Sequence, residues 1–261
     1  MKNYFNIKVL PFLKKYCNLQ VLPFLTMGLC GLGLALRIWL FSGGVDAKGL
    51  IILWHPANLL CWALPFLAVA VQWLCLWDGV PDMSYSALFP KSVSAAAGCV
   101  LGAAGIVLFC LKDIQTYPGT NYPEIVALVV GILSAAALLL SAFCRYKGLR
   151  PTPVLRAIPC LFFMLHIVCR HQVWSLEAQP QIYCFDIVLN VLLLLTCYCR
   201  AALDAKKPLR RRCLLLQQVT TVVCFMCVPG QDRFVYLALA GWLLLDTPVL
   251  ISPRAMWRNQ R

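Results

Sequence analysis

Three pairs of polar residues lie within long apolar stretches of this 261-residue chain, and their side chains are the ones best suited to bind a ligand. The residues of each pair are three or four positions apart, which places both side chains on one face of a helix. The pairs are His55 and Asn58, His166 and Arg170, and Asp186 and Asn190. Imidazole, guanidinium, carboxylate and amide groups together can hold a small polar solute or an ion through charge and hydrogen bonds.

The composition indicates that membrane-spanning helices carry these pairs. Hydrophobic residues make up 61% of the chain and charged residues only 13%, and the mean hydropathy is +0.78. An average soluble domain is about 45–50% apolar and about 25% charged. So few charged side chains cannot cover the core of a soluble fold of this length. The sequence therefore predicts an all-α, multi-pass integral membrane protein, and it excludes an ordinary soluble enzyme domain and a disordered chain.

Eight stretches are long and apolar enough to cross about 30 Å of hydrocarbon as helices. They cover residues 21–41, 50–77, 92–111, 124–144, 154–173, 182–199, 213–228 and 234–251. Breaks rich in Gly and Pro separate most of them, as expected for helix ends. The stretch 213–228 is short and contains Gln217 and Gln218, and the stretch 182–199 contains Asp186 and Asn190. A bundle of seven spans is therefore the alternative to eight.

The basic residues predict the orientation of the bundle. With eight spans and the N-terminus in the cytoplasm, 18 of the 23 Lys and Arg residues fall on the cytoplasmic side. This bias is the one that the positive-inside rule describes, and an odd number of spans would place one basic terminus outside. We therefore expect both termini in the cytoplasm and the protein in the plasma membrane. The net charge of +13 then reflects orientation and contact with anionic lipid headgroups at the basic cytoplasmic loops, rather than nucleic-acid binding.

Three parts of the chain are expected from the positions of these stretches. Residues 1–20 alternate lysines with aromatic residues and predict a lead-in that lies on the cytoplasmic membrane surface. Residues 21–251 form the transmembrane bundle, and residues 252–261 form a basic cytoplasmic tail.

The three polar pairs and Arg37 are expected within about 12–15 Å of the outer membrane surface. Polar groups at membrane depth are costly, so they commonly mark a functional site. We therefore expect the three pairs to line a shared polar chamber that opens outward. The structural alternative is that Arg170 neutralises Asp186 across a short hairpin, while the His and Asn side chains form hydrogen bonds of about 1 kcal/mol between helices. For Arg37, we expect its long side chain to extend to the lipid headgroups.

A further carboxylate, Asp246, interrupts the last apolar stretch on the cytoplasmic side, where Gln217 and Gln218 of the preceding stretch can face it. An intramembrane carboxylate is a candidate group for coupling solute movement to a proton or cation. The alternative is that Asp246 only caps the end of the last helix near the interface.

The remaining residues give little support for metal binding or catalysis. The 15 cysteines lie mostly in apolar stretches, where Cys behaves as a small hydrophobe, and their irregular spacing predicts no disulfide framework. His166 and His171 are five residues apart and share a helix face poorly, so we expect no metal site and no cofactor. Because no hydrolase, zinc-protease or nucleotide-binding motif occurs, an enzyme is disfavoured.

Small residues predict close helix packing in the middle of the chain. Gly98 and Gly102 form a GxxxG pair, which allows two helix backbones to approach closely. Packing within the bundle is the first expectation, and a homo-oligomer face is the alternative.

The sequence thus favours a small-solute or ion carrier, or a component of a permease, with an outward-facing polar chamber. The alternative is a non-catalytic assembly or sensory module that binds a partner through residues 203–212 and the basic tail.

Overall fold

The structure is a computed structural model that describes residues 21–46, 50–77, 91–116, 122–174, 180–207, 209–230 and 232–251. These residues form eight helices, which confirms the all-helical prediction. The helices are α2 (Leu22–Gly43), α3 (Pro56–Trp77), α4 (Val93–Thr116), α5 (Tyr122–Lys147), α6 (Val154–Trp174), α7 (Pro180–Asp204), α8 (Arg210–Cys227) and α9 (Arg233–Ile251). The predicted lead-in (1–20) and tail (252–261) lie outside the described residues.

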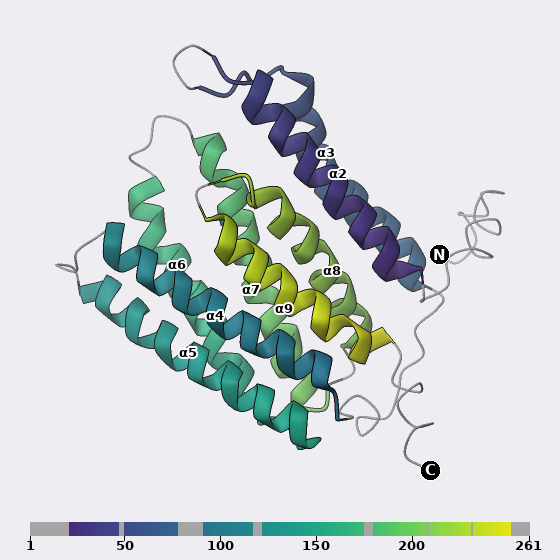
Figure 1. Ribbon diagram of the computed structural model, residues 1–261, viewed down its shortest axis with the longest axis vertical. Helices are drawn as coiled ribbons and strands as arrows, with labels where there is room; N and C mark the ends of the chain where they lie inside the picture. Colours follow the sequence, from purple (N-terminus) through teal and green to yellow (C-terminus); the bar gives the residue numbers. More distant parts are fainter. Residues whose placement is uncertain are drawn as a thin grey trace, which may run out of the picture.

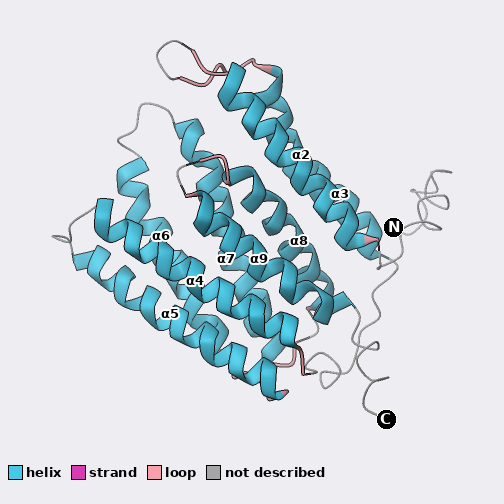
Figure 2. Cartoon of the chain, in the orientation of Figure 1, coloured by secondary structure: helices cyan, strands magenta, loops and turns pink. Residues whose placement is uncertain are grey.

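The helices run alternately up and down in one bundle (Figure 1). The α2–α3 hairpin lies on one side and the α4–α5 hairpin on the other, with α8 and α9 between them. Helix α4 packs against α5 and α9, whereas α6 packs against α5 and α7. Helices therefore fill the molecule from one side to the other, and Figure 2 shows that the described loops lie at the two ends.

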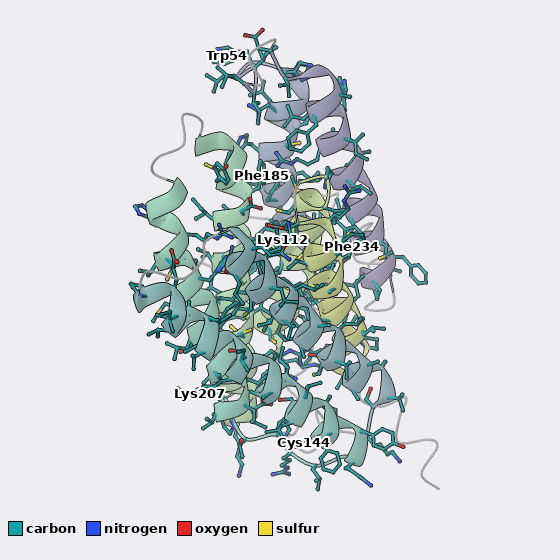
Figure 3. All side chains as sticks on the ribbon, turned by 60° about the vertical axis from the view of Figure 1, so that its left-hand side comes forward. Trp54, Lys112, Cys144, Phe185, Lys207 and Phe234 are labelled. Atoms are coloured by element: carbon teal, nitrogen blue, oxygen red, sulfur yellow. The ribbon has the colours of Figure 1, made fainter. Side chains whose placement is uncertain are left out.

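The two ends of the bundle differ in charge. One end, here called the basic end, carries Lys147, Arg150, Lys206, Lys207 and the start of α8, where Arg210, Arg211 and Arg212 follow one another. The other, the opposite end, carries the described parts of the α2–α3 connection. In Figure 3, Trp54 marks the opposite end, and Lys207 and Cys144 lie toward the basic end. This separation agrees with the pattern behind the predicted orientation, and the orientation itself stays a prediction.

Seven of the helices, all except α8, are long and apolar enough to cross a membrane. Their outer faces expose large apolar side chains, including Phe24 at 78%, Phe66 at 74% and Ile132 at 59%. Water would not tolerate an apolar surface this extensive on a soluble monomer, whereas lipid does. The protein is therefore a multi-pass integral membrane protein.

Helix α8 is less apolar than the other seven helices, and it tolerates polar residues because it packs against protein rather than lipid. It contacts α2, α3, α7 and α9, and 13 of its 18 residues are buried. Its glutamines and threonines therefore form hydrogen bonds inside the bundle instead of facing lipid. At about 1.5 Å per residue, 18 residues measure about 27 Å, which is close to the thickness of the hydrocarbon layer. The described part of the bundle thus has eight helices, as the first prediction states. Apolar composition alone identifies seven of them as membrane-spanning.

The predicted glycine pair packs within the bundle. A Cβ atom on Gly98 would lie 2.9 Å from the carbonyl oxygen of Trp242 in α9, and one on Gly102 would lie 2.7 Å from the Trp242 ring. The missing side chains therefore allow α4 and α9 to approach closely. The first expectation for this pair, packing inside the bundle, is confirmed.

Candidate functional site

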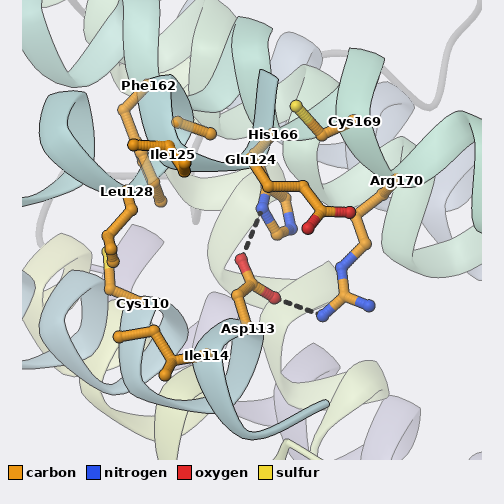
Figure 4. Close-up of a pocket in the computed structure, with 11 residues that line it drawn as sticks. Cys110, Asp113, Ile114, Glu124, Ile125, Leu128, Phe162, His166, Cys169 and Arg170 are labelled. Carbon is orange, nitrogen blue, oxygen red and sulfur yellow. Dashed lines mark hydrogen bonds and ion pairs between the residues drawn. The ribbon is translucent and has the colours of Figure 1, made fainter. Parts of the chain in front are cut away.

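A cavity of about 230 Å³ lies between α4, α5 and α6, toward the opposite end; we call it the α4–α6 cavity (Figure 4). Most of its wall is apolar. The wall residues are Cys110, Ile114, Ile125, Ala127, Leu128, Phe162 and Cys169, and the charged or titratable residues are Asp113, Glu124, His166 and Arg170. A largely apolar wall with a few convergent polar groups is the usual composition of a small-molecule site.

Asp113 of α4 joins the two predicted residues of α6. One of its carboxylate oxygens lies 3.4 Å from Nδ1 of His166, and the other forms an ion pair with Arg170. His166 and Arg170 are one helical turn apart, so both side chains point toward α4. The side chain of His166 is 4% exposed, whereas that of Asp113 is 32% exposed. The carboxylate is therefore anchored at both oxygens and still borders the cavity.

Glu124, in the first turn of α5, brings a second carboxylate to this cavity. Figure 4 shows its side chain on the same side of the cavity as His166 and Arg170. Among the described residues it has no hydrogen-bond or ion-pair partner, although the partly positive N-terminus of α5 favours its charge. The cavity therefore holds two carboxylates, one guanidinium and one imidazole.

The sequence prediction missed both carboxylates because of where the apolar stretches end. Asp113 lies two residues beyond the stretch 92–111, and Glu124 is the first residue of the stretch 124–144. In the sequence, both therefore look like charged residues of a solvent-exposed loop. In the structure α4 continues to Thr116, so Asp113 is part of the helix and faces α6. The spacing of Cys110 and Asp113, which share a face of α4, was the available signal.

Asp186 does not pair with Arg170. Its carboxylate accepts a hydrogen bond from the Tyr236 hydroxyl at 2.8 Å. Asn190 donates its Nδ2 to the backbone oxygen of Asp186 at 2.8 Å, within the same helix. The structural alternative, in which Arg170 neutralises Asp186, is therefore not what the described residues show, because each of the two has another partner.

The ring of Phe109 contacts both the His166 side chain at the cavity and Tyr236, the partner of Asp186. Phe109 of α4 packs against His166 at 4.9 Å and against Tyr236 at 6.0 Å, measured between ring centroids. Neither Asp186 nor its partner Tyr236 is among the residues that line the α4–α6 cavity.

His55 and Asn58 bond within the segment that begins α3. The Nδ1 of His55 accepts a hydrogen bond from the Ala57 backbone N–H at 3.3 Å, and Nδ2 of Asn58 donates to the backbone oxygen of Leu53 at 3.0 Å. The six predicted residues are thus distributed over three places, and only His166 and Arg170 line the α4–α6 cavity. Ligand binding by the other four stays a prediction.

Arg37 does not extend to the membrane surface as expected. The residue is 3% exposed, and its Nε donates to the backbone oxygen of Met226 at 3.2 Å. Its guanidinium lies 4.6 Å from the ring centroid of Phe185 and 4.8 Å from that of Phe41. Cation–π contacts and a buried carbonyl therefore hold the charge inside the bundle.

Asp246 belongs to a second polar region, near the basic end. Its carboxylate forms an ion pair with Arg200 of α7. The Nη2 atom of Arg200 also donates a hydrogen bond to Oε1 of Gln217 in α8 at 2.7 Å. Beside this pair, Thr247 accepts hydrogen bonds from Gln217 at 2.9 Å and from Gln218 at 3.0 Å. At 2% exposed, Asp246 lies inside the bundle rather than at a helix end near the interface.

Further charges surround this ion pair. Arg156 of α6 lies 4.0 Å from Asp204 of α7, and Arg145 of α5 interacts electrostatically with both Asp204 and Asp246. We call Arg145, Arg156, Arg200, Asp204 and Asp246 the buried charge cluster; none of them is more than 6% exposed. Four helices therefore meet around opposite charges, and removal of one partner would leave an uncompensated charge inside the bundle. A coupling role for Asp246 stays a prediction.

Metal binding and thiol chemistry concern the other described residues. They contain no group of three His, Cys, Asp or Glu side chains that could hold a metal ion. No disulfide joins the cysteines placed by the structure, all of which are buried or half-buried. Neither feature adds a catalytic arrangement to the two polar regions.

Comparison with known proteins gives no family for the chain: no protein-family model, curated protein or solved structure matches it.

Proposed function

We propose that this protein is a small-solute carrier, or the solute-binding component of a permease, and that the solute binds in the α4–α6 cavity. The observation that supports this proposal is the unpartnered Glu124 carboxylate beside the Asp113–His166–Arg170 group in an otherwise apolar cavity. Charged side chains between membrane-spanning helices commonly mark substrate or ion pathways.

The lining favours a solute with a positive charge and an apolar body. Glu124 is the carboxylate left without a partner among the described residues, and it can accept a cation such as a protonated amine. The Phe162 ring and the aliphatic side chains of Ile125 and Leu128 supply apolar contact for the rest of the solute. A ring face also attracts a cation directly.

The predicted orientation makes this cavity outward-facing, because it lies toward the end opposite the basic one. Carriers expose a site to each side of the membrane in turn. In this proposal the buried charge cluster holds the basic end closed, and Asp246 takes part in opening because its ion pair with Arg200 must separate.

Uptake into liposomes that contain the purified protein tests the proposal. Three probes of similar shape differ in charge: phenethylamine is a cation, phenylacetate an anion and 2-phenylethanol neutral. We expect the protein to accelerate uptake of the cation specifically. Glu124→Gln should weaken this uptake about tenfold, because it removes a charged partner.

The matched control is Asp46→Asn, which removes an exposed carboxylate outside the cavity. This variant should transport phenethylamine as the wild type does. Equal acceleration of the three probes over protein-free liposomes, or equal losses in both variants, would contradict the proposal.

A further inference from the structure

A second cavity, of about 170 Å³, lies between the end of α3 and the start of α8. We call it the α3–α8 groove. Its lining consists of Trp73, Leu76, Leu215, Arg211 and Arg212. We infer that this groove binds one anionic phospholipid, with the phosphate at the two arginines and an acyl chain along the apolar residues.

The two kinds of lining residue lie at different depths. Trp73 and Leu76 belong to the last turns of α3, whose apolar span runs to Leu76. Arg211 and Arg212 lie in the first turn of α8, at the basic end, with Leu215 one turn deeper. The apolar lining residues are thus at the depth of the hydrocarbon, and the two arginines are at its edge. A phospholipid has the same order, with its phosphate at the edge and its acyl chains deeper.

The charge of the groove selects an anion. Two of the five lining residues are arginines and none is acidic. Arg210 is not available to the groove, because its guanidinium donates to the backbone oxygen of Leu250 at 2.6 and 2.8 Å. Basic pockets between transmembrane helices are known to bind anionic lipid headgroups.

The local electrostatics of α8 support the same occupant. The first turn of α8 contains three arginines and no acidic residue, and its N-cap, Leu209, makes no side-chain hydrogen bond to the helix. Positive side chains at the positive end of a helix dipole are unfavourable, so a bound phosphate would offset them. The groove, rather than the helix end alone, makes the site.

The apolar lining favours a lipid over a free anion. Trp73 is 48% exposed and the adjacent Leu74 is 51% exposed, so the outer face of α3 is in contact with hydrocarbon here. Inorganic phosphate would use only the arginines. A phospholipid would use both parts of the groove, and Trp is a common residue at this depth of the membrane.

Thermal unfolding of the purified full-length protein in detergent tests this inference. The additions are phosphatidylglycerol, phosphatidylcholine with the same acyl chains, and inorganic phosphate. We expect phosphatidylglycerol to raise the midpoint most, because it binds the folded protein. The double variant R211Q/R212Q should bind phosphatidylglycerol at least tenfold more weakly, whereas K147Q/R150Q, which loses the same charge at the basic end outside the groove, should respond as the wild type does.

Crosslinking on the unmodified protein provides a second measurement that does not depend on the variants folding. A photoreactive phosphatidylglycerol with its reactive group in the acyl chain should label residues 73–76 or residue 215, and unlabelled phosphatidylglycerol should compete better than phosphatidylcholine. Labelling elsewhere would overturn the inference. So would equal responses to the two lipids, equal effects of the two double variants, or a phosphate response as large as the lipid response. Because the groove and the α4–α6 cavity are at different ends, uptake of phenethylamine can fail without affecting any of these results.

Discussion

Several carboxylates in this bundle are buried or half-buried, and each is held in place by a specific charged or hydrogen-bonding partner. The side chains of Asp246 and Arg200 are 3% and 5% exposed, and each is the other's ion-pair partner. Asp113 is shared between His166 and Arg170, whereas Asp186 accepts a hydrogen bond from the neutral hydroxyl of Tyr236. A buried charge costs little while it is paired and much when its partner is removed. The consequences of substitution should therefore differ sharply between these carboxylates.

Replacing Asp246 with Ala should lower the free energy of unfolding by about 3–5 kcal/mol, because it leaves the Arg200 charge buried without its partner. Thermal or denaturant unfolding in detergent measures this loss. The double variant Asp246→Ala/Arg200→Met should recover part of it. If the single variant were as stable as the wild type, the ion pair would not hold the helices together.

Asp113 and Asp186 should respond differently to loss of charge. Asp113→Asn weakens two charged contacts and should cost about 2–3 kcal/mol of stability, since hydrogen bonds to charged groups are each worth about 1.5–3 kcal/mol. Asp186→Asn keeps an acceptor for the Tyr236 hydroxyl and should cost about 1 kcal/mol or less. Unfolding of the two variants in parallel decides the point, and the reverse order would contradict the greater contribution of the Asp113 charge.

At the level of helices, hydropathy predicts which residues form each helix. A helix that crosses the hydrocarbon must be apolar along most of its length, and this requirement is visible in the sequence. The stretch 213–228 is one of the two weakest of the eight, yet α8 forms because α2, α3, α7 and α9 surround it. Partners across helices depend on rotation about each helix axis, which hydropathy does not record. That is why His166 and Arg170 were identified, whereas their shared partner Asp113 was missed.

The close approach of α4 and α9 makes its own prediction. Gly102→Ala should destabilise the protein by about 1–3 kcal/mol, because the new Cβ would lie 2.7 Å from the Trp242 ring, and Trp242 is itself only 2% exposed. Gly28→Ala is the matched control, since a Cβ there meets nothing within 4 Å. Unfolding midpoints should fall for the first variant and stay or rise for the second. A loss of stability at both positions would contradict this account of the packing.

For the molecule as a whole, alternating helices and a separation of charge between two ends make the orientation testable. The basic end carries exposed Lys207, and the opposite end carries exposed Asp46. In intact cells, Asp46→Cys in a background with reduced cysteine content should react with a membrane-impermeant maleimide. Lys207→Cys should react only after permeabilisation, because positive loops stay in the cytoplasm. The opposite labelling pattern would reverse the proposed outward direction of the α4–α6 cavity.

The central claim is that the α4–α6 cavity binds a small organic cation through Glu124. Equilibrium titration of phenethylamine into the purified protein, with the wild type, Glu124→Gln and Asp46→Asn side by side, tests it most directly. We predict saturable binding to the wild type and to Asp46→Asn, and binding about tenfold weaker to Glu124→Gln. Binding of equal strength to all three proteins, or no binding to any of them, would contradict the claim.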